Sequence, residues 1–97
     1  MLRLELSREA DADLIGMLEY GGEQFGWAAA EAYVARFDQS FALLCEYPEI
    51  GTVHHQVRPP IRSWSHYSHR IFYDIEAEAI FVRRILHQSQ DVVRWLS

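Results

Sequence analysis

The 97-residue sequence contains no lysine and a single cysteine, Cys45. One cysteine excludes an internal disulfide, and we expect it to be a small core residue. No stretch approaches the roughly 20 consecutive apolar residues of a membrane span. The first residues lack the basic start and apolar run of a secretory signal. We therefore expect a cytoplasmic protein that makes no membrane contact.

Positive charge is scarce and unevenly placed. Residues 1–51 carry three arginines against ten acids, 3 − 10 = −7, whereas residues 52–97 carry six against four, 6 − 4 = +2. All five histidines lie in the second half. Affinity for nucleic acids comes mainly from clustered Lys and Arg that neutralise phosphates. The acidic balance therefore argues against direct nucleic-acid binding by this chain.

The first half of the sequence predicts one strand and two helices. Residues 2–6 alternate leucine with polar residues, the period of a half-buried strand. Ser7 is an N-cap for a helix to about Tyr20, which Gly21 and Gly22 stop. The acids of its first turn are interpreted as a solvated helix start: Glu9, Asp11 and Asp13. Apolar residues three or four apart then predict a second helix over residues 27–47, which forms an antiparallel hairpin with the first.

The second half is rich in β-branched and aromatic residues. Pro59 and Pro60 exclude a central strand around them, so we predict the next strand over residues 61–66. Residues 69–76 and 79–87 flank a short acidic loop and predict a β-hairpin. Residues 91–96 are long enough for a short C-terminal helix.

These elements together predict one α+β domain over residues 1–97. Their order is β-α-α-β-β-β, with the helix hairpin packed on a largely antiparallel four-stranded sheet. On the third strand the period of two separates Ile71 and Tyr73 from Arg70 and Phe72. On the last strand it places Arg84 with Ile80, Val82 and Leu86, opposite Phe81, Arg83, Ile85 and His87. Because the hairpin covers only one face, we expect the other to present an open patch of aromatic residues and arginines to a partner.

Four motifs carry a family resemblance: "YPEIG", "VRPPIRSW", "SHRIFYDIE" and "VRRILHQSQD". In this order, over nearly the whole chain, they resemble the ParE branch of the RelE/ParE superfamily of bacterial toxins. The resemblance implies a compact toxin that a cognate ParD-like antitoxin wraps and neutralises in a hetero-oligomeric complex. For the ParE branch it also implies non-enzymatic inhibition of DNA gyrase and arrested replication. For the RelE branch it implies ribosome-dependent cleavage of messenger RNA.

The residues weigh against the nuclease branch. Cleavage by 2′-hydroxyl attack needs groups that take and give protons, and cations against the charge that builds on the phosphate. Arg70 matches the third-strand arginine of RelE-like nucleases, and His87 is a candidate proton donor. Residues 88–90, however, are Gln, Ser and Gln where cations are needed, and Val93 or Trp95 holds the terminal tyrosine position. We predict no catalytic residues; a nuclease using Arg70 and His87 is one alternative, and a degenerate toxin that keeps only antitoxin binding is another.

The candidate contact residues for antitoxin or target are Arg58, Arg62, Arg70, Phe72, Phe81, Arg83 and His87. For Arg58 and Arg62, beside the two prolines, contact with a partner and simple solvation are equally open. Arg84 is interpreted as framework, with its guanidinium paired to an acid or to carbonyls, and alternation sends Arg83 to the opposite face. The histidines diverge too much for a metal site, and we predict neither metal nor cofactor.

Overall fold

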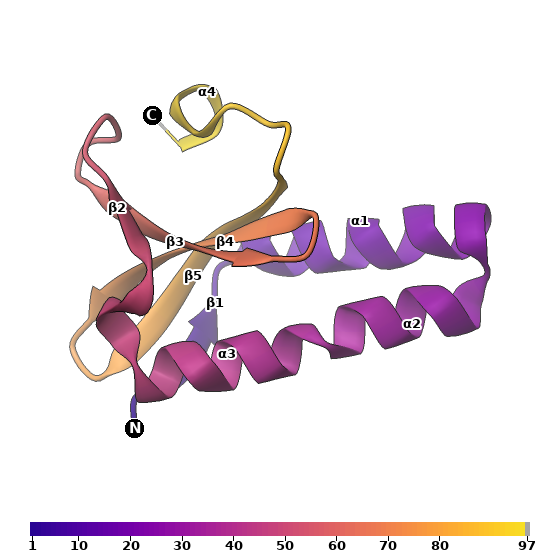
Figure 1. The fold of residues 1–97 in the computed structure, drawn as a ribbon, viewed down its shortest axis with the longest axis horizontal. Helices are drawn as coiled ribbons and strands as arrows, with labels where there is room; N and C mark the ends of the chain where they lie inside the picture. The colour runs from indigo at the N-terminus through magenta and orange to yellow at the C-terminus, as the bar shows by residue number, and fades with distance from the viewer. Residues whose placement is uncertain (97) are drawn as a thin grey trace.

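The structure is a computed structural model that describes residues 1–96. It has an α+β fold in which helices and a sheet form separate layers (Figure 1). Its elements are β1 (Arg3–Leu6), α1 (Arg8–Phe25), α2 (Trp27–Ala35), α3 (Phe37–Glu46), the 3-10 helix η1 (Pro48–Ile50), β2 (Thr52–His54), β3 (Ile61–His66), β4 (His69–Glu76), β5 (Ala79–His87) and α4 (Val92–Leu96). The predicted fold class, the bounds of the last three strands and the short C-terminal helix are confirmed.

The sheet differs from the prediction in one strand. It has five strands in the order β1-β5-β4-β3-β2, and all neighbours are antiparallel except β1 and β5, which run parallel. The additional strand, β2, has three residues, too few for a period of two to be recognised in the sequence. The predicted four-stranded sheet is therefore corrected to a mixed sheet of five strands.

The helix hairpin is longer than predicted because Gly21 and Gly22 do not end α1. The helix continues to Phe25 and ends at Gly26, whose φ of +90° favours glycine. A Cβ on Gly22 would lie 2.4 Å from the Trp27 ring. These glycines therefore let α2 approach α1 closely instead of stopping it. The predicted Ser7 cap is confirmed, with its Oγ 2.9 Å from the backbone nitrogen of Ala10.

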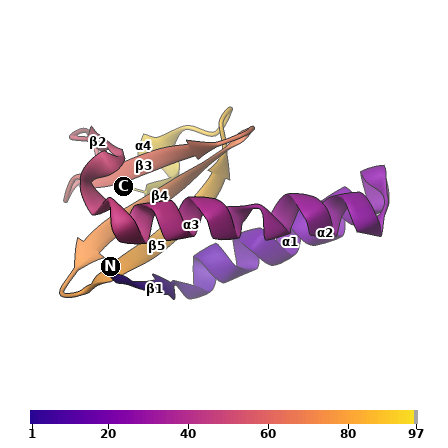
Figure 2. The same ribbon diagram turned by 60° about the horizontal axis from the view of Figure 1, so that its bottom comes forward.

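The second predicted helix is divided into α2 and α3 at Arg36. Arg36 keeps helical backbone angles, φ −65° and ψ −20°, so the break changes the direction of the chain little. Figure 2 shows α2 and α3 running on along one side of the sheet. Together they form the second arm of the hairpin, as predicted.

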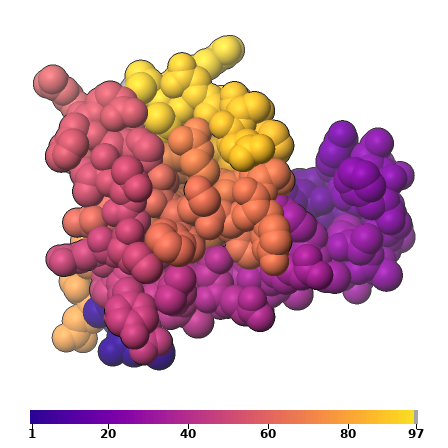
Figure 3. Space-filling model, in the orientation of Figure 1, coloured from indigo at the N-terminus to yellow at the C-terminus, as the bar shows by residue number. Residues whose placement is uncertain are grey.

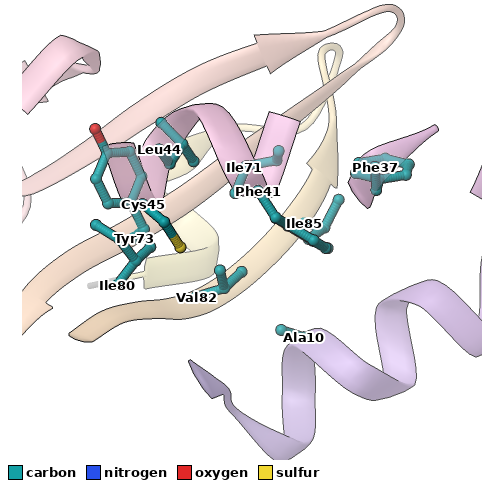
Figure 4. Close-up of a cluster of buried hydrophobic side chains, with 10 residues drawn as sticks. All are labelled: Ala10, Phe37, Phe41, Leu44, Cys45, Ile71, Tyr73, Ile80, Val82 and Ile85. Atoms are coloured by element: carbon teal, nitrogen blue, oxygen red, sulfur yellow. The ribbon is translucent and has the colours of Figure 1, made fainter. Parts of the chain in front are cut away.

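One face of the sheet, here called the hairpin face, packs against α1 and α3. Aliphatic and aromatic side chains from β4 and β5 meet residues of both helices (Figure 4). The buried cluster consists of Ala10, Phe37, Phe41, Leu44, Cys45, Ile71, Tyr73, Ile80, Val82 and Ile85. Two of these helix residues, Phe37 and Leu44, are at most 1% exposed. This cluster is the main core of the protein.

The opposite face, here called the far face, is not open as predicted. Phe72 of β4 is 0% exposed and belongs to a second buried cluster with Val57, Ile61, Leu86 and Val92. The segment before β3 and helix α4 supply the cover, and Figures 1 and 3 show the C-terminal segment, in yellow, lying over this side of the sheet. Neither segment has a long apolar period, so the sequence offered no sign of the cover. The prediction that Phe72 lies on an exposed patch is therefore wrong.

A β-bulge in β5 changes which residues share a face. Phe72 pairs with Arg84 and Tyr73 pairs with Val82, so Arg83 is the extra residue. A bulge shifts the alternation by one residue beyond it. Ile85 therefore lies on the hairpin face with Ile80 and Val82, and Leu86 lies on the far face. The prediction that Leu86 shares a face with Ile80, and that Ile85 lies opposite, is wrong.

Candidate partner-binding groove

A cavity of about 780 Å³ lies between the helix hairpin and one end of the sheet. We call it the hairpin groove. It is lined by Ala12, Asp13, Gly16, Met17, Tyr20, Gly21 and Phe25 of α1, by Ala29, Ala30 and Tyr33 of α2, and by Ser68, His69, Ile85, His87 and Gln90 from the sheet end.

The groove exists because the hairpin is longer than the sheet it covers. The outer halves of α1 and α2 project past the strands (Figures 1 and 3). Ala12, Gly16 and Tyr20 of α1 are one turn apart and form one wall of the groove. The small side chains at positions 12 and 16 leave the groove wide there. Three aromatic residues near the hairpin tip are more than half exposed: Tyr20 at 64%, Phe25 at 74% and Trp27 at 55%. Apolar residues that form an exposed patch mark a site of interaction with another molecule.

The sheet end of the groove is polar and contains two histidines. The Nδ1 atom of His69 lies 2.7 Å from the Tyr33 hydroxyl oxygen. The His69 and His87 rings are nearly perpendicular, with centroids 5.4 Å apart. Burial, and then the neighbouring charges of His87 and His66, lower the pKa of His69. This end therefore offers imidazole nitrogens at the boundary between an apolar groove and solvent.

Asp13 joins the start of the hairpin to the edge of β5. Its carboxylate accepts two hydrogen bonds from the Arg84 guanidinium, each 2.9 Å long, and a third of 2.8 Å from the backbone N–H of Ile85. The hydrogen bond from Arg84 to Asp13 raises the pKa of Arg84. The predicted pairing of Arg84 with an acid is confirmed, whereas the interpretation of Asp13 as part of a solvated helix start is wrong. Helical position alone cannot reveal this role, because it depends on where β5 ends up.

The bulge also brings Arg83 and Arg84 together on the far side. Both line a shallow depression with Glu9, Trp95 and Leu96. The prediction that alternation separates the two arginines is therefore wrong. Each guanidinium already has an acidic partner, since Arg83 lies 3.0 Å from Asp74.

The two residues of the nuclease alternative lie on opposite faces of the sheet. Arg70 is on the far face, where it donates to the Gln90 carbonyl oxygen at 3.0 Å and lies over the Phe72 ring. His87 is on the other side and lines the hairpin groove. The geometry does not bring them to one reacting atom.

The remaining candidate contact residues are scattered. Arg62 donates to the carbonyl oxygens of Glu49 and Gly51, both at 3.1 Å, and so ties β3 to the segment before β2. Arg58 is exposed and Phe81 is half-buried. Neither lines the hairpin groove. Sequence analysis thus identified one groove residue, His87, and missed the apolar wall, which could have been sought in the one-turn spacing of Ala12, Gly16 and Tyr20.

Two kinds of site are not found in the described part of the chain. Residues 1–96 contain no group of three or more His, Cys, Asp or Glu side chains placed to hold a metal ion. None of the helices within these residues is both long and apolar enough to span a membrane.

The fold and this site define a small α+β domain with an apolar groove between a helix hairpin and the end of a sheet. Residues 4–92 match the family model described as the ParE toxin of the type II toxin–antitoxin system parDE. The chain therefore belongs to the ParE toxin family. The resemblance of its four motifs to the ParE branch is confirmed.

Individual relatives agree with this assignment. The chain is 33% identical over 93 residues to Toxin ParE1 of Mycobacterium tuberculosis strain H37Rv, which covers 95% of both chains. It is 29% identical over 86 residues to Toxin ParE1 of Caulobacter vibrioides, covering 89% of this chain and 88% of the relative. A solved structure titled "Chromosomal ParDE TA system from P. aeruginosa" has the same fold, with a TM-score of 0.76 at 19% identity, over 90% of this chain and 96% of the other.

Proposed function

We propose that this ParE-family toxin acts by binding proteins and not by catalysis. Its target in the proposal is DNA gyrase, whose inhibition in the cytoplasm blocks replication. A ParD-like antitoxin, encoded beside it, holds it inactive in a hetero-oligomeric complex. The observation that carries the proposal is the hairpin groove, a mostly apolar cavity of about 780 Å³ in a protein of this family.

The antitoxin is proposed to lie in the hairpin groove. An amphipathic helix recognises a groove by placing one apolar face in it, and the helical walls of this groove are lined mainly by apolar and small residues. On the sheet face for which we first predicted this role, the region around Phe72 is covered by Val57 and α4 of the protein itself. Exposed aromatic residues at the hairpin tip extend the same surface.

Co-purification tests the antitoxin part of the proposal. The toxin is expressed with the product of the adjacent short reading frame, which should bind it tightly and abolish growth arrest. The toxin expressed alone should arrest growth and be poorly behaved in solution. A chain that is monomeric and harmless without any partner would contradict the proposal.

A supercoiling assay tests the target. Purified gyrase should lose supercoiling activity when the free toxin is added and regain it when the antitoxin is added in excess. Induction in cells should leave messenger RNA intact while DNA-damage signalling rises. Unimpaired gyrase together with mapped transcript cleavage would favour the nuclease alternative, against which the placement of Arg70 and His87 on opposite faces argues. Tight antitoxin binding with no growth arrest would indicate a degenerate toxin.

A further inference from the structure

Gly16 lowers the stability of α1, and no contact within residues 1–96 requires a glycine at this position. It lies in the interior of α1, where glycine destabilises a helix by roughly 1 kcal/mol relative to alanine. A Cβ built on it would have no atom within 4 Å. Gly21 and Gly22 differ, since added Cβ atoms there would meet Ala30 and Trp27. The missing side chain of Gly16 therefore keeps space free on the outside of the protein, along the wall of the hairpin groove.

His87 has a fixed hydrogen-bonding pattern at the sheet end of the groove. The backbone N–H of Ser89 donates to His87 Nδ1 at 3.2 Å, and the Ser89 hydroxyl lies 2.8 Å from the same atom. Because Nδ1 accepts from a backbone amide, it does not carry a proton. The hydrogen of the neutral ring is then on Nε2. Within residues 1–96 this Nε2 has no hydrogen-bond partner, so His87 offers a neutral N–H donor to the groove.

His69 is able to take up a proton in place. Its Nδ1 faces the Tyr33 hydroxyl, whose oxygen also lies 3.3 Å from Ser68 Oγ. When His69 is charged, Nδ1–H donates to the Tyr33 oxygen and the phenol donates to Ser68, so every bond is kept. Its Nε2 has no partner within residues 1–96. His69 and His87 therefore form a pair of Nε2 donors, and His69 accepts an additional proton without losing a bond.

Among the described residues, no free acid lies at the sheet end of the groove to pair with these donors. Four titratable groups face His69: Tyr33 from α2, Asp13 from α1, His66 from β3 and His87 from β5. Both oxygens of Asp13 are already occupied by Arg84 and Ile85. Any carboxylate that pairs with these donors therefore comes from the molecule that occupies the groove.

We propose that a helix of the antitoxin crosses α1 at Gly16 and delivers an aspartate or glutamate to the Nε2 donors of His69 and His87. The proposal rests on the antitoxin binding proposed above and adds the chemistry of the contact. Docking of the carboxylate favours protonated His69, so complex formation takes up a proton. Linkage then requires that affinity rises as pH falls from about 8 to about 6.

Binding of the purified product of the adjacent reading frame tests the steric part. Gly16→Leu should weaken binding by at least about 30-fold, the size of a hot-spot loss. Gly16→Ala should weaken it less. Neither change should lower the thermal unfolding midpoint, because both improve helix propensity and a Cβ at this position has no atom within 4 Å. Ala28→Leu, an equally exposed position on α2 outside the groove, is the matched control and should bind as wild type does.

The charge part is tested by pH and by paired changes. His87→Phe, which keeps a ring but has no N–H, should weaken binding about tenfold at every pH, the loss of one hydrogen bond to a charged group. His69→Gln should also remove the rise in affinity at low pH. His55→Gln, on an exposed loop outside the groove, should change neither. Acids of the antitoxin helix are changed to amides one at a time, and one of them should lose its effect in the His69→Gln background.

The possible failures are distinguishable. If wild-type toxin binds the antitoxin but Gly16→Leu and His87→Phe bind equally well, the contact proposed here is overturned and the antitoxin proposal stands. If wild-type toxin does not bind the adjacent product, both fall. If Gly16→Leu instead dissociates a homodimer of the toxin, the occupant is a second copy of this chain, which also overturns the proposal.

Discussion

The two faces of the sheet are buried by different kinds of segment. The hairpin face is covered by α1 and α3, long helices of the first half of the chain. The far face is covered by a loop residue, Val57, and by the five-residue helix α4. The far face needs a cover because the bulge in β5 directs Leu86 there beside Phe72. A sheet with apolar residues on both faces buries both, with whatever segment the chain supplies.

The covers also differ in how much surface they have to spare. The far cover is short, and its buried residues face the sheet. The hairpin extends past the end of the sheet (Figure 1), so part of its apolar stripe has no partner within residues 1–96. The hairpin groove is this excess. An uncovered, mostly apolar groove thus arises on the side where the cover is longer than the core requires.

Two fully buried phenylalanines give the largest test of this comparison. Phe37 of α3 is 1% exposed and Phe72 of β4 is 0% exposed. We expect Phe37→Ala to cost about 4 kcal/mol and Phe72→Ala about 3 kcal/mol, because the short far cover relaxes more easily into a cavity. Urea unfolding measures both losses of unfolding free energy, provided that the variants keep the m-value of the wild type. A larger loss for Phe72→Ala would show that the far face is the more rigid of the two.

The link between hairpin and sheet gives the next largest effect. Asp13→Asn should destabilise the protein by about 2 kcal/mol, because it leaves the Arg84 guanidinium poorly paired at a site that is mostly shielded from water. The figure is below that of a fully buried pair, since both side chains keep some solvent contact. Asp11→Asn, an exposed acid in the same helical turn, is the control and should stay within about 0.5 kcal/mol. Equal effects of the two changes, measured by urea unfolding, would contradict a structural role for Asp13.

The sequence predicted the elements well where a long regular pattern exists. The bounds of β4 and β5 follow from runs of β-branched and aromatic residues, and the hairpin follows from a helical period. The bulge at Arg83 could not be predicted, because a register shift is a property of two strands together. The prediction therefore placed the residues of β5 beyond the bulge on the wrong faces, among them Ile85 and Leu86.

The site was harder to predict than the fold. Gly21 and Gly22 have the composition of a helix stop, but their function is to admit Trp27 and Ala30, which is visible only once α2 is in place. The far cover depends on isolated residues such as Val57 and Val92, which have no periodic neighbours to mark them. Whether the far face is open or covered depends on these two segments of the chain. For this reason the sequence did not show that Phe72, one of the predicted contact residues, is buried under the far cover.

The far cover should open on its own. Val92 is 7% exposed and Val93, the next residue of α4, is 40% exposed. We expect Val92→Ala to cost about 1 kcal/mol and Val93→Ala less than about 0.5 kcal/mol. Hydrogen exchange in Val92→Ala should quicken at the amides of α4, with those of β4 unchanged, because few contacts hold this helix. Equal quickening in both elements would show that the far cover unfolds only with the whole domain.

The smallest effects concern histidines on the two sides of the sheet. His66 is 5% exposed and lies against Phe37, while His54 is half-buried with its ring 5.6 Å from that of Phe72. Burial lowers the pKa of both, helped by Arg36 for His66 and by Arg70 for His54.

Because the unfolded chain binds these protons more readily, each histidine contributes stability at neutral pH that is lost as pH falls below about 6.5. Replacing either by glutamine should flatten the decline of unfolding free energy between pH 7 and pH 5, measured by urea titrations at each pH. We expect His66→Gln to flatten it more, because its ring is more completely removed from water on the side with the longer cover. A steeper curve for either variant would contradict the direction of these pKa shifts.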